Sequence, residues 1–189
     1  MKLKSVVLLI TLIASGCQTT PKIDAATLNA VMTYYPAQVS VTQSANFSSG
    51  LVSMGDVTSQ QLADKFAAES QARLASELPA IMRGSKPANI VILLQTASIS
   101  SGAGRAVLGT DSFVDATISI VDASTGTTVG ARSVHAIDAA SRNDSSINGI
   151  PVGALLSLAV NASQSDEQTR IAKITEAFLI ETKRQLGGK

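Results

Sequence analysis

The chain contains few side chains that could carry out acid–base or nucleophilic chemistry. His135 is its only histidine, and Asp111 with Asp115 and Asp166 with Glu167 are its candidate acidic pairs. A histidine base needs an orienting carboxylate and a nucleophile on a strained turn, and the sequence has no Gly-x-Ser-x-Gly element. We therefore predict no catalytic residue. A glycosidase stays open as an alternative, because its two carboxylates need not be close in sequence.

Neither a metal site nor a nucleotide site is expected. One histidine and one cysteine cannot build a zinc site. The glycines Gly102, Gly104 and Gly109 are similar to a dinucleotide-binding loop, but the third is misplaced and a strand, not a helix, is predicted to follow. We expect no cofactor. Arg105 in this loop is interpreted either as a solvated side chain or as a contact with a partner.

The only cysteine, Cys17, ends a pattern that indicates covalent modification. Two lysines precede an apolar run from Val6 to Ile13, which is followed by Ala14-Ser15-Gly16 and then Cys17. This order is typical of a secretory signal peptide, here residues 1–16, with cleavage before the cysteine. The apolar run is too short to cross a hydrocarbon core, which takes about 20 residues.

The segment Ala14-Ser15-Gly16-Cys17 resembles the lipobox of bacterial lipoproteins, although Ala14 stands where lipoboxes most often have leucine. The resemblance implies that Cys17 carries a diacylglyceryl group on its thiol and an acyl chain on its amine, and several chains give a lasting anchor. Gln18 implies the outer membrane, because Asp at this position favours retention in the inner membrane. The alternative is an ordinary signal peptide that leaves Cys17 as a free thiol.

Composition limits the remaining function classes. Removal of Lys2 and Lys4 with the signal leaves 13 basic residues against 14 acidic ones, so the formal charge changes from +1 to −1. A near-neutral chain with 3% aromatic residues and no Trp lacks the surface that nucleic-acid binding needs. No cysteine remains for a disulfide, so stability must come from a packed core. We predict a lipidated N-terminus and tether over 17–30 and a single domain over 31–189.

Hydrophobic patterning predicts the elements of this domain. Val39 and Val41 alternate with polar residues as in a strand, and a capping box at Thr58 and Gln61 begins a helix that ends near Leu78. This helix has an apolar stripe at Leu62, Phe66, Leu74, Leu78 and Ile81, and a favourable pair of Glu69 with Arg73. A central strand covered on both faces is predicted over Ile90–Ile99, and a strand with one wet face over Val114–Ile120. A turn over Asp122–Gly126, with Gly126 at positive φ, leads to a partner strand over Val129–Ile137. The last predicted helix begins with a capping box at Ser165 and Gln168, has its apolar stripe at Ile171, Ile174 and Phe178, and stops at Gly187.

The order strand, helix, three strands, helix predicts an α+β fold. We expect a mostly antiparallel sheet of about four strands with two amphipathic helices on one face. The apolar run Ile150–Val160 is too short to span a bilayer. It is either a short helix packed into the core or an exposed patch, and its candidate interaction residues are Leu155, Leu156, Leu158 and Val160.

Three stretches carry a loose family resemblance. Gly102–Ala106, Ile120–Gly126 and the helix Leu62–Leu78, together with the lipobox, resemble small bacterial envelope lipoproteins over roughly 39–186. That group includes the accessory domain of the curli-secretion lipoprotein and the N-terminal domain of TolB. The chain has no long insertion able to form membrane hairpins, so the resemblance does not imply a pore.

These observations predict a non-enzymatic, lipid-anchored periplasmic domain that acts as an adaptor or subunit of an envelope assembly. The expected partners are the membrane, through the lipid, and an envelope protein or a second copy of the chain. The alternative is a domain that binds or hydrolyses a small molecule or glycan at a site assembled only in the fold. A deep pocket lined by Arg105, Asp111 and His135 would favour this alternative.

Overall fold

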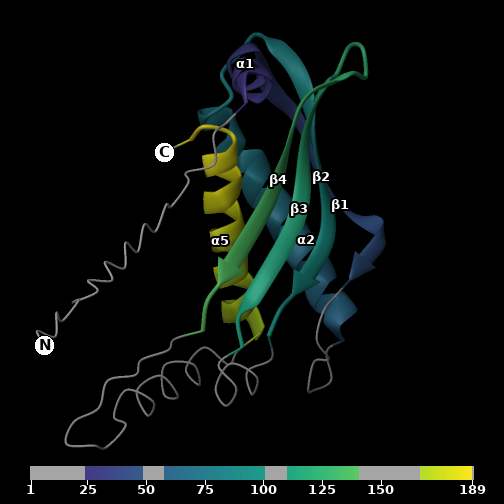
Figure 1. Ribbon diagram of the computed structural model, residues 1–189, viewed down its shortest axis with the longest axis vertical. Coiled ribbons are helices and arrows are strands. Elements are labelled where there is room, and N and C mark those ends of the chain that lie inside the picture. The colour runs from purple at the N-terminus through teal and green to yellow at the C-terminus, as the bar shows by residue number, and fades with distance from the viewer. Residues whose placement is uncertain (1–23, 49–57, 101–109, 141–166, 189) are drawn as a thin grey trace, which may run out of the picture.

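The computed structural model describes residues 24–48, 58–100, 110–140 and 167–188. They form two layers, a four-stranded sheet and the helices α2 and α5, which lie on one of its faces (Figure 1). The elements are α1 (Ala25–Thr33), β1 (Tyr34–Ser48), α2 (Ser59–Glu77), the short 3₁₀ helix η1 (Leu78–Ala80), β2 (Lys86–Ser98), β3 (Ser112–Asp122), β4 (Thr128–Asp138) and α5 (Glu167–Gln185). The predicted α+β class is confirmed.

The sheet has the strand order β1-β2-β3-β4 and is mixed. β1 and β2 are parallel, with Val41 opposite Ile92, because the chain passes through α2 between them. β2 with β3 and β3 with β4 pair antiparallel, with Ile92 opposite Ile118 and Ile118 opposite Arg132. The sheet is therefore mostly antiparallel, as the strand patterns predicted.

The hydrophobic core lies between the sheet and the two long helices. Alternate residues of β3 are buried while their neighbours are half-buried, which confirms a strand with one wet face. Phe66 of α2 and Phe178 of α5 are fully buried and meet edge to face, with ring centroids 5.5 Å apart. The buried members of the two predicted helical stripes are Leu62, Phe66, Leu74, Leu78, Ile171, Ile174 and Phe178.

Three predicted helix and turn signals are confirmed. Gln61 N–H donates to the Thr58 hydroxyl, and Thr58 N–H donates to the Gln61 side chain at 2.8 Å, which completes the capping box. Gly126 has φ 72° in the turn between β3 and β4, and Gly187 has φ 84° after α5. Gly188 N–H donates to the Lys183 carbonyl across the end of α5, which satisfies a terminal carbonyl of the helix.

The predicted tether over 17–30 is wrong for its last six residues, since Ala25–Ala30 lie in α1. Asp24 caps this helix by accepting a hydrogen bond from Thr27 N–H at 2.7 Å. Thr27 and Ala30 are buried against β4 at Gly130, where an added Cβ would lie 3.2 Å from the Thr27 Cα. The helix was missed because contact with β4, rather than an apolar stripe of its own, stabilises it.

The prediction that the central strand is covered on both faces is also wrong. Ile90, Ile92 and Leu94 of β2 are fully buried, but Leu93 on the opposite face is 39% exposed. The described helices all pack on the face that carries the buried set. Among the described residues no helix covers the outer face of the sheet, so the continuous apolar run predicted more burial of β2 than the structure shows.

Candidate functional site

One end of the sheet carries the described residues on either side of three internal stretches of the chain. β1 and β2 are parallel and both end there, while β3 begins there because Ser98 pairs with Phe113. β4 ends beside the start of β3, since Asp138 pairs with Ser112. The described residues that flank 49–57, 101–109 and 141–166 therefore all lie at this end, which we call the loop end (Figure 1). The opposite end, the α1 end, carries α1, Gly84 and the 123–127 turn.

Hydrogen bonds join the residues that flank two of these stretches, and we call these residues the root cluster. Ser100 N–H donates to the Ser112 hydroxyl at 3.1 Å, and the Ser100 hydroxyl donates to the Asp111 carbonyl at 2.6 Å. The Asp111 carboxylate accepts from Ala140 N–H at 2.8 Å. The Arg170 guanidinium, from the first turn of α5, donates to the Ser100 carbonyl. The ends of β2, β3 and β4 are thus tied to α5.

Burial gives the root cluster its rigidity. Ser112 is fully buried, and Ser100 and Arg170 are 2% and 8% exposed. Polar groups removed from water are costly unless they are hydrogen-bonded, so the bonds of the cluster fix the positions of these residues strongly. The cluster was not found from the sequence. The sequence feature that could have revealed the cluster is Arg170, a charged residue that lies four positions before Ile174 and therefore on the buried stripe of α5.

The predicted interaction residues belong to the stretches that the root cluster flanks. Arg105 falls in 101–109, between Ser100 and Asp111, and the four apolar candidates fall in 141–166, between Ala140 and α5. All lie outside the described residues, as does Cys17. The structure brings the flanks of the two stretches together through the bond between Asp111 and Ala140.

His135 and Asp115 form an exposed pair on the outer face of the sheet. They are directly opposite each other on β4 and β3, and His135 Nδ1 lies 2.6 Å from Asp115 Oδ1. Their side chains are 57% and 37% exposed, and the Phe113 ring lies 6.2 Å from the imidazole. Within residues 24–48, 58–100, 110–140 and 167–188, no three His, Cys, Asp or Glu side chains gather to hold a metal ion. The pair has the orientation of a base and its positioning carboxylate, but it lies on an open surface.

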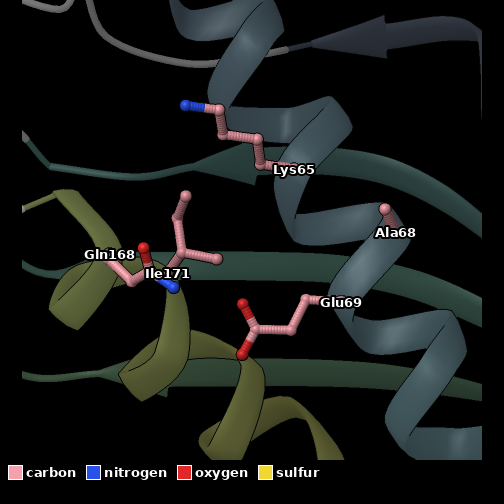
Figure 2. A pocket seen from close by; sticks show the side chains of 5 residues that line it. All are labelled: Lys65, Ala68, Glu69, Gln168 and Ile171. Carbon is pink, nitrogen blue, oxygen red and sulfur yellow. The ribbon is translucent and has the colours of Figure 1, made fainter.

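Two hollows flank α2 and share Ala68. The first, of about 360 Å³, lies between α2 and α5, where Lys65 and Glu69 of α2 face Gln168 and Ile171 of α5 (Figure 2). The second, of about 500 Å³, lies between α2 and β1, and its lining residues are Val41, Thr42, Gln43, Asp64, Ala67, Ala68 and Gln71. Neither hollow is lined by Asp111 or His135. Neither hollow is therefore the pocket lined by Arg105, Asp111 and His135 that would favour binding or hydrolysis of a small molecule or glycan.

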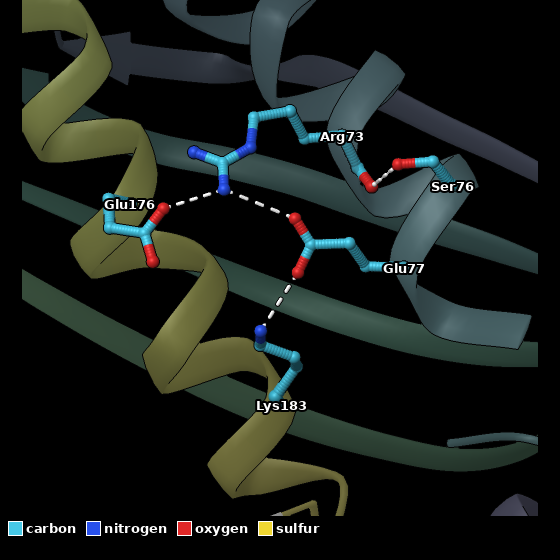
Figure 3. Close-up of polar contacts among 5 residues, drawn as sticks. All are labelled: Arg73, Ser76, Glu77, Glu176 and Lys183. Carbon is cyan, nitrogen blue, oxygen red and sulfur yellow. Dashed lines mark hydrogen bonds and ion pairs between the residues drawn. The ribbon is translucent and has the colours of Figure 1, made fainter. Parts of the chain in front are cut away.

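Ion pairs join α2 and α5 near the end of α2 (Figure 3). Arg73 lies 2.6 Å from Glu176 and 3.1 Å from Glu77, and Lys183 lies 2.8 Å from Glu77. The hydrogen bond from Lys183 is the main cause that holds the pKa of Glu77 below its usual range, against the opposing effect of burial. The hydrogen bond to Glu176 raises the pKa of Arg73. These four residues link the two helices through their side chains.

Among the described residues, no helix combines the length and apolar character that crossing a membrane requires. Comparison with known proteins gives distant structural similarity alone. No family model matches the sequence, and no curated protein matches it.

Two solved structures resemble the fold. Protein XCC0632 from Xanthomonas campestris, of family DUF330, is 12% identical, with 82% of this chain and 85% of that chain covered and a TM-score of 0.33. Lipoprotein GNA1162 from Neisseria meningitidis is 16% identical, with 71% of this chain and 99% of that chain covered and a TM-score of 0.27. The chain thus has a distant structural resemblance to a bacterial lipoprotein, at a level that assigns no family and no function.

Proposed function

We propose that this chain is a lipid-anchored protein of the bacterial cell envelope, held by Cys17 at the periplasmic face of the outer membrane. In this proposal it is not an enzyme. The domain serves as an adaptor or subunit of an envelope assembly and contacts its partner, an envelope protein or a second copy, at the loop end.

The observation that carries the anchor is the order of residue types before Cys17. A basic start, a short apolar run and small residues lead to the only cysteine of the chain. Only six residues separate Cys17 from Asp24, which caps α1, so the folded domain begins close behind the proposed lipid.

The loop end supports the adaptor role. It is the end of the sheet that carries the described residues flanking 101–109 and 141–166, the stretches with Arg105 and with Leu155, Leu156, Leu158 and Val160. The root cluster gives both stretches a rigid base, and connecting segments on a rigid scaffold are where binding residues concentrate.

The anchor is tested with Cys17→Ala, and His135→Ala is the matched control. We expect Cys17→Ala to abolish acylation, measured by mass spectrometry of the purified protein, and to release the chain from the outer-membrane fraction. His135→Ala should retain both the acylation and the location, because the proposal gives the imidazole no role. An unacylated wild-type protein would contradict the anchor at Cys17. Loss of membrane association in His135→Ala would contradict the proposal that His135 has no part in anchoring.

The partner surface is tested by photo-crosslinking in intact membranes. A photoreactive amino acid replaces Ile137, which is 50% exposed at the loop end, or Ile180, which is 54% exposed on α5 about 20 Å from the start of that helix. We expect a discrete protein adduct or a self-crosslinked dimer from position 137 and none from position 180. Equal adducts at both positions, or none at either, would overturn the proposed loop-end contact.

A further inference from the structure

The exposed side of α1 carries large apolar side chains. Leu28 and Met32 are one helical turn apart and are 46% and 72% exposed, and Tyr35 at the start of β1 is 41% exposed. On the opposite side of the helix, Thr27 and Ala30 pack against β4. We call Leu28 and Met32 the α1 patch.

The α1 patch lies close to the proposed anchor along the chain. Cys17 and Asp24 are separated by six residues, so even a fully extended chain between them spans only about 25 Å. The helix that begins at Ala25 is thus the first described element behind the lipid. A short tether keeps this surface at a high effective concentration beside the membrane. A contact made by only a few apolar side chains can then be well populated although it would be weak without the tether.

The charges around the patch suit the anionic surface of a bilayer. No residue of α1 is charged. Lys86 is exposed and pairs with Tyr34 in the sheet, and Arg83 precedes Gly84, whose N–H donates to the Tyr34 carbonyl.

The neighbouring acids are already engaged within the domain. Asp24 forms an ion pair with Arg132 at 3.1 Å, and Asp122 accepts a hydrogen bond from the Tyr34 hydroxyl at 2.8 Å. Arg83 and Lys86 thus belong to the segment whose backbone contacts the end of α1 at Gly84, and α1 itself carries no charge.

We infer that the α1 patch inserts its apolar side chains at the boundary between headgroups and acyl chains, with Arg83 and Lys86 on the phosphates. The contact fixes the orientation of the domain. The α1 end faces the membrane, and the loop end points away from it. This inference rests on the proposed anchor at Cys17, and its occupant is the lipid bilayer rather than a protein.

The absence of tryptophan from the chain provides a clean test. The full-length acylated protein is reconstituted into vesicles of phosphatidylethanolamine and phosphatidylglycerol with brominated acyl chains, which quench indole fluorescence on contact. Met32→Trp and Leu28→Trp report on the patch. Ile137→Trp is the control, because Ile137 is as exposed as Leu28 and lies about 23 Å along β4 from Gly130, the contact point of α1.

We expect brominated lipid to remove more than half of the indole emission of Met32→Trp and Leu28→Trp, with a shift to shorter wavelength. Emission of Ile137→Trp should be unchanged. Acylated protein with no quenching in either patch variant, or with equal quenching in Ile137→Trp, overturns the membrane contact and leaves the anchor standing. Absence of acylation in the same samples, seen by mass spectrometry, overturns both. Circular dichroism confirms that each variant is folded.

Discussion

At the scale of single residues, Gly84 is the most closely surrounded of the glycines that the structure describes. A Cβ added there would lie 2.0 Å from the Thr33 carbonyl carbon and 2.2 Å from the Tyr34 nitrogen. Both are backbone atoms at the junction of α1 and β1, and they cannot move aside as a flexible side chain would. Gly84 thus allows β2 to begin directly beside β1, where its own N–H donates to the Tyr34 carbonyl.

We predict that Gly84→Ala destabilises the domain by at least about 3 kcal/mol, because the junction of α1, β1 and β2 must separate. Gly126→Ala is the control. Its Cβ would meet no atom within 4 Å, so its cost is the positive φ alone, about 1 kcal/mol. Urea unfolding followed by far-UV circular dichroism measures both. Equal destabilisation of the two variants would contradict the steric argument.

These two glycines show what the sequence reveals at this scale. Gly126 follows an Asp-x-x-Thr pattern, so its positive φ is predictable from its immediate neighbours. Gly84 is required by Thr33 and Tyr34, which lie far earlier in the chain, and no local pattern records that approach. The root cluster is hidden in the same way, since Ser100 and Arg170 are 70 residues apart in the sequence and no local pattern joins them.

At the scale of elements, the ion pairs between α2 and α5 differ from those the sequence suggested. The spacing of Glu69 and Arg73 predicted a pair within α2, but Arg73 contacts Glu77 and Glu176 instead. Spacing of four residues is satisfied equally by Glu69 and Glu77, and α5 decides between them by placing Glu176 and Lys183 beside the end of α2.

We predict that Glu77→Gln lowers stability at pH 7 and low salt by about 0.5 kcal/mol, because the pairs are partly exposed and screened by solvent. The pKa of Glu77 is lowered in the folded protein from its ordinary 4.5, so its contribution is present above that value. The contribution is lost as the pH falls through the lowered pKa.

The difference between wild type and Glu77→Gln should therefore shrink from pH 5 towards pH 2 in urea titrations. Glu69→Gln is the matched control, since Glu69 forms no ion pair among the described residues. If the difference in stability between the two proteins stayed constant over this pH range, the ionised carboxylate of Glu77 would not be the cause of the stabilisation.

The elements that could be predicted are those with a strong period of their own. The stripes of α2 and α5 and the alternation of β3 follow directly from side-chain spacing. α1 is short and uncharged, and its burial depends on Gly130 of a distant strand, so its residues read as part of the tether. The pairing of β1 with β2 was not predicted, because the helix between them permits a parallel pair but does not determine that these two strands are neighbours.

At the scale of the whole molecule, Phe66 and Phe178 connect the two helices within the single core of the described structure. We predict that Phe178→Ala lowers the free energy of unfolding by about 3–5 kcal/mol, through lost burial and a cavity against Phe66. The change should appear as one cooperative transition, with the same midpoint by circular dichroism and by hydrogen exchange of the sheet.

Ile180→Ala is the control for this change, because Ile180 lies on the same helix but is 54% exposed. Its effect should stay within about 0.5 kcal/mol. A similar loss in both variants would contradict the aromatic contact as the source of the stability that Phe178 contributes.

A side chain of α2 forms a hydrogen bond with the backbone of the edge strand β1. The Gln71 side chain reaches from α2 and accepts from Val41 N–H at 3.0 Å, on the side of β1 that faces away from β2. This bond occupies one backbone donor that a strand added to β1 would need, so pairing at this point of β1 is hindered, whereas β4 is the other edge of the described sheet. Growth from one edge alone stops once two β4 strands have met. If β4 is the edge that pairs, self-association through the sheet would end at a closed pair and would not propagate into a fibre.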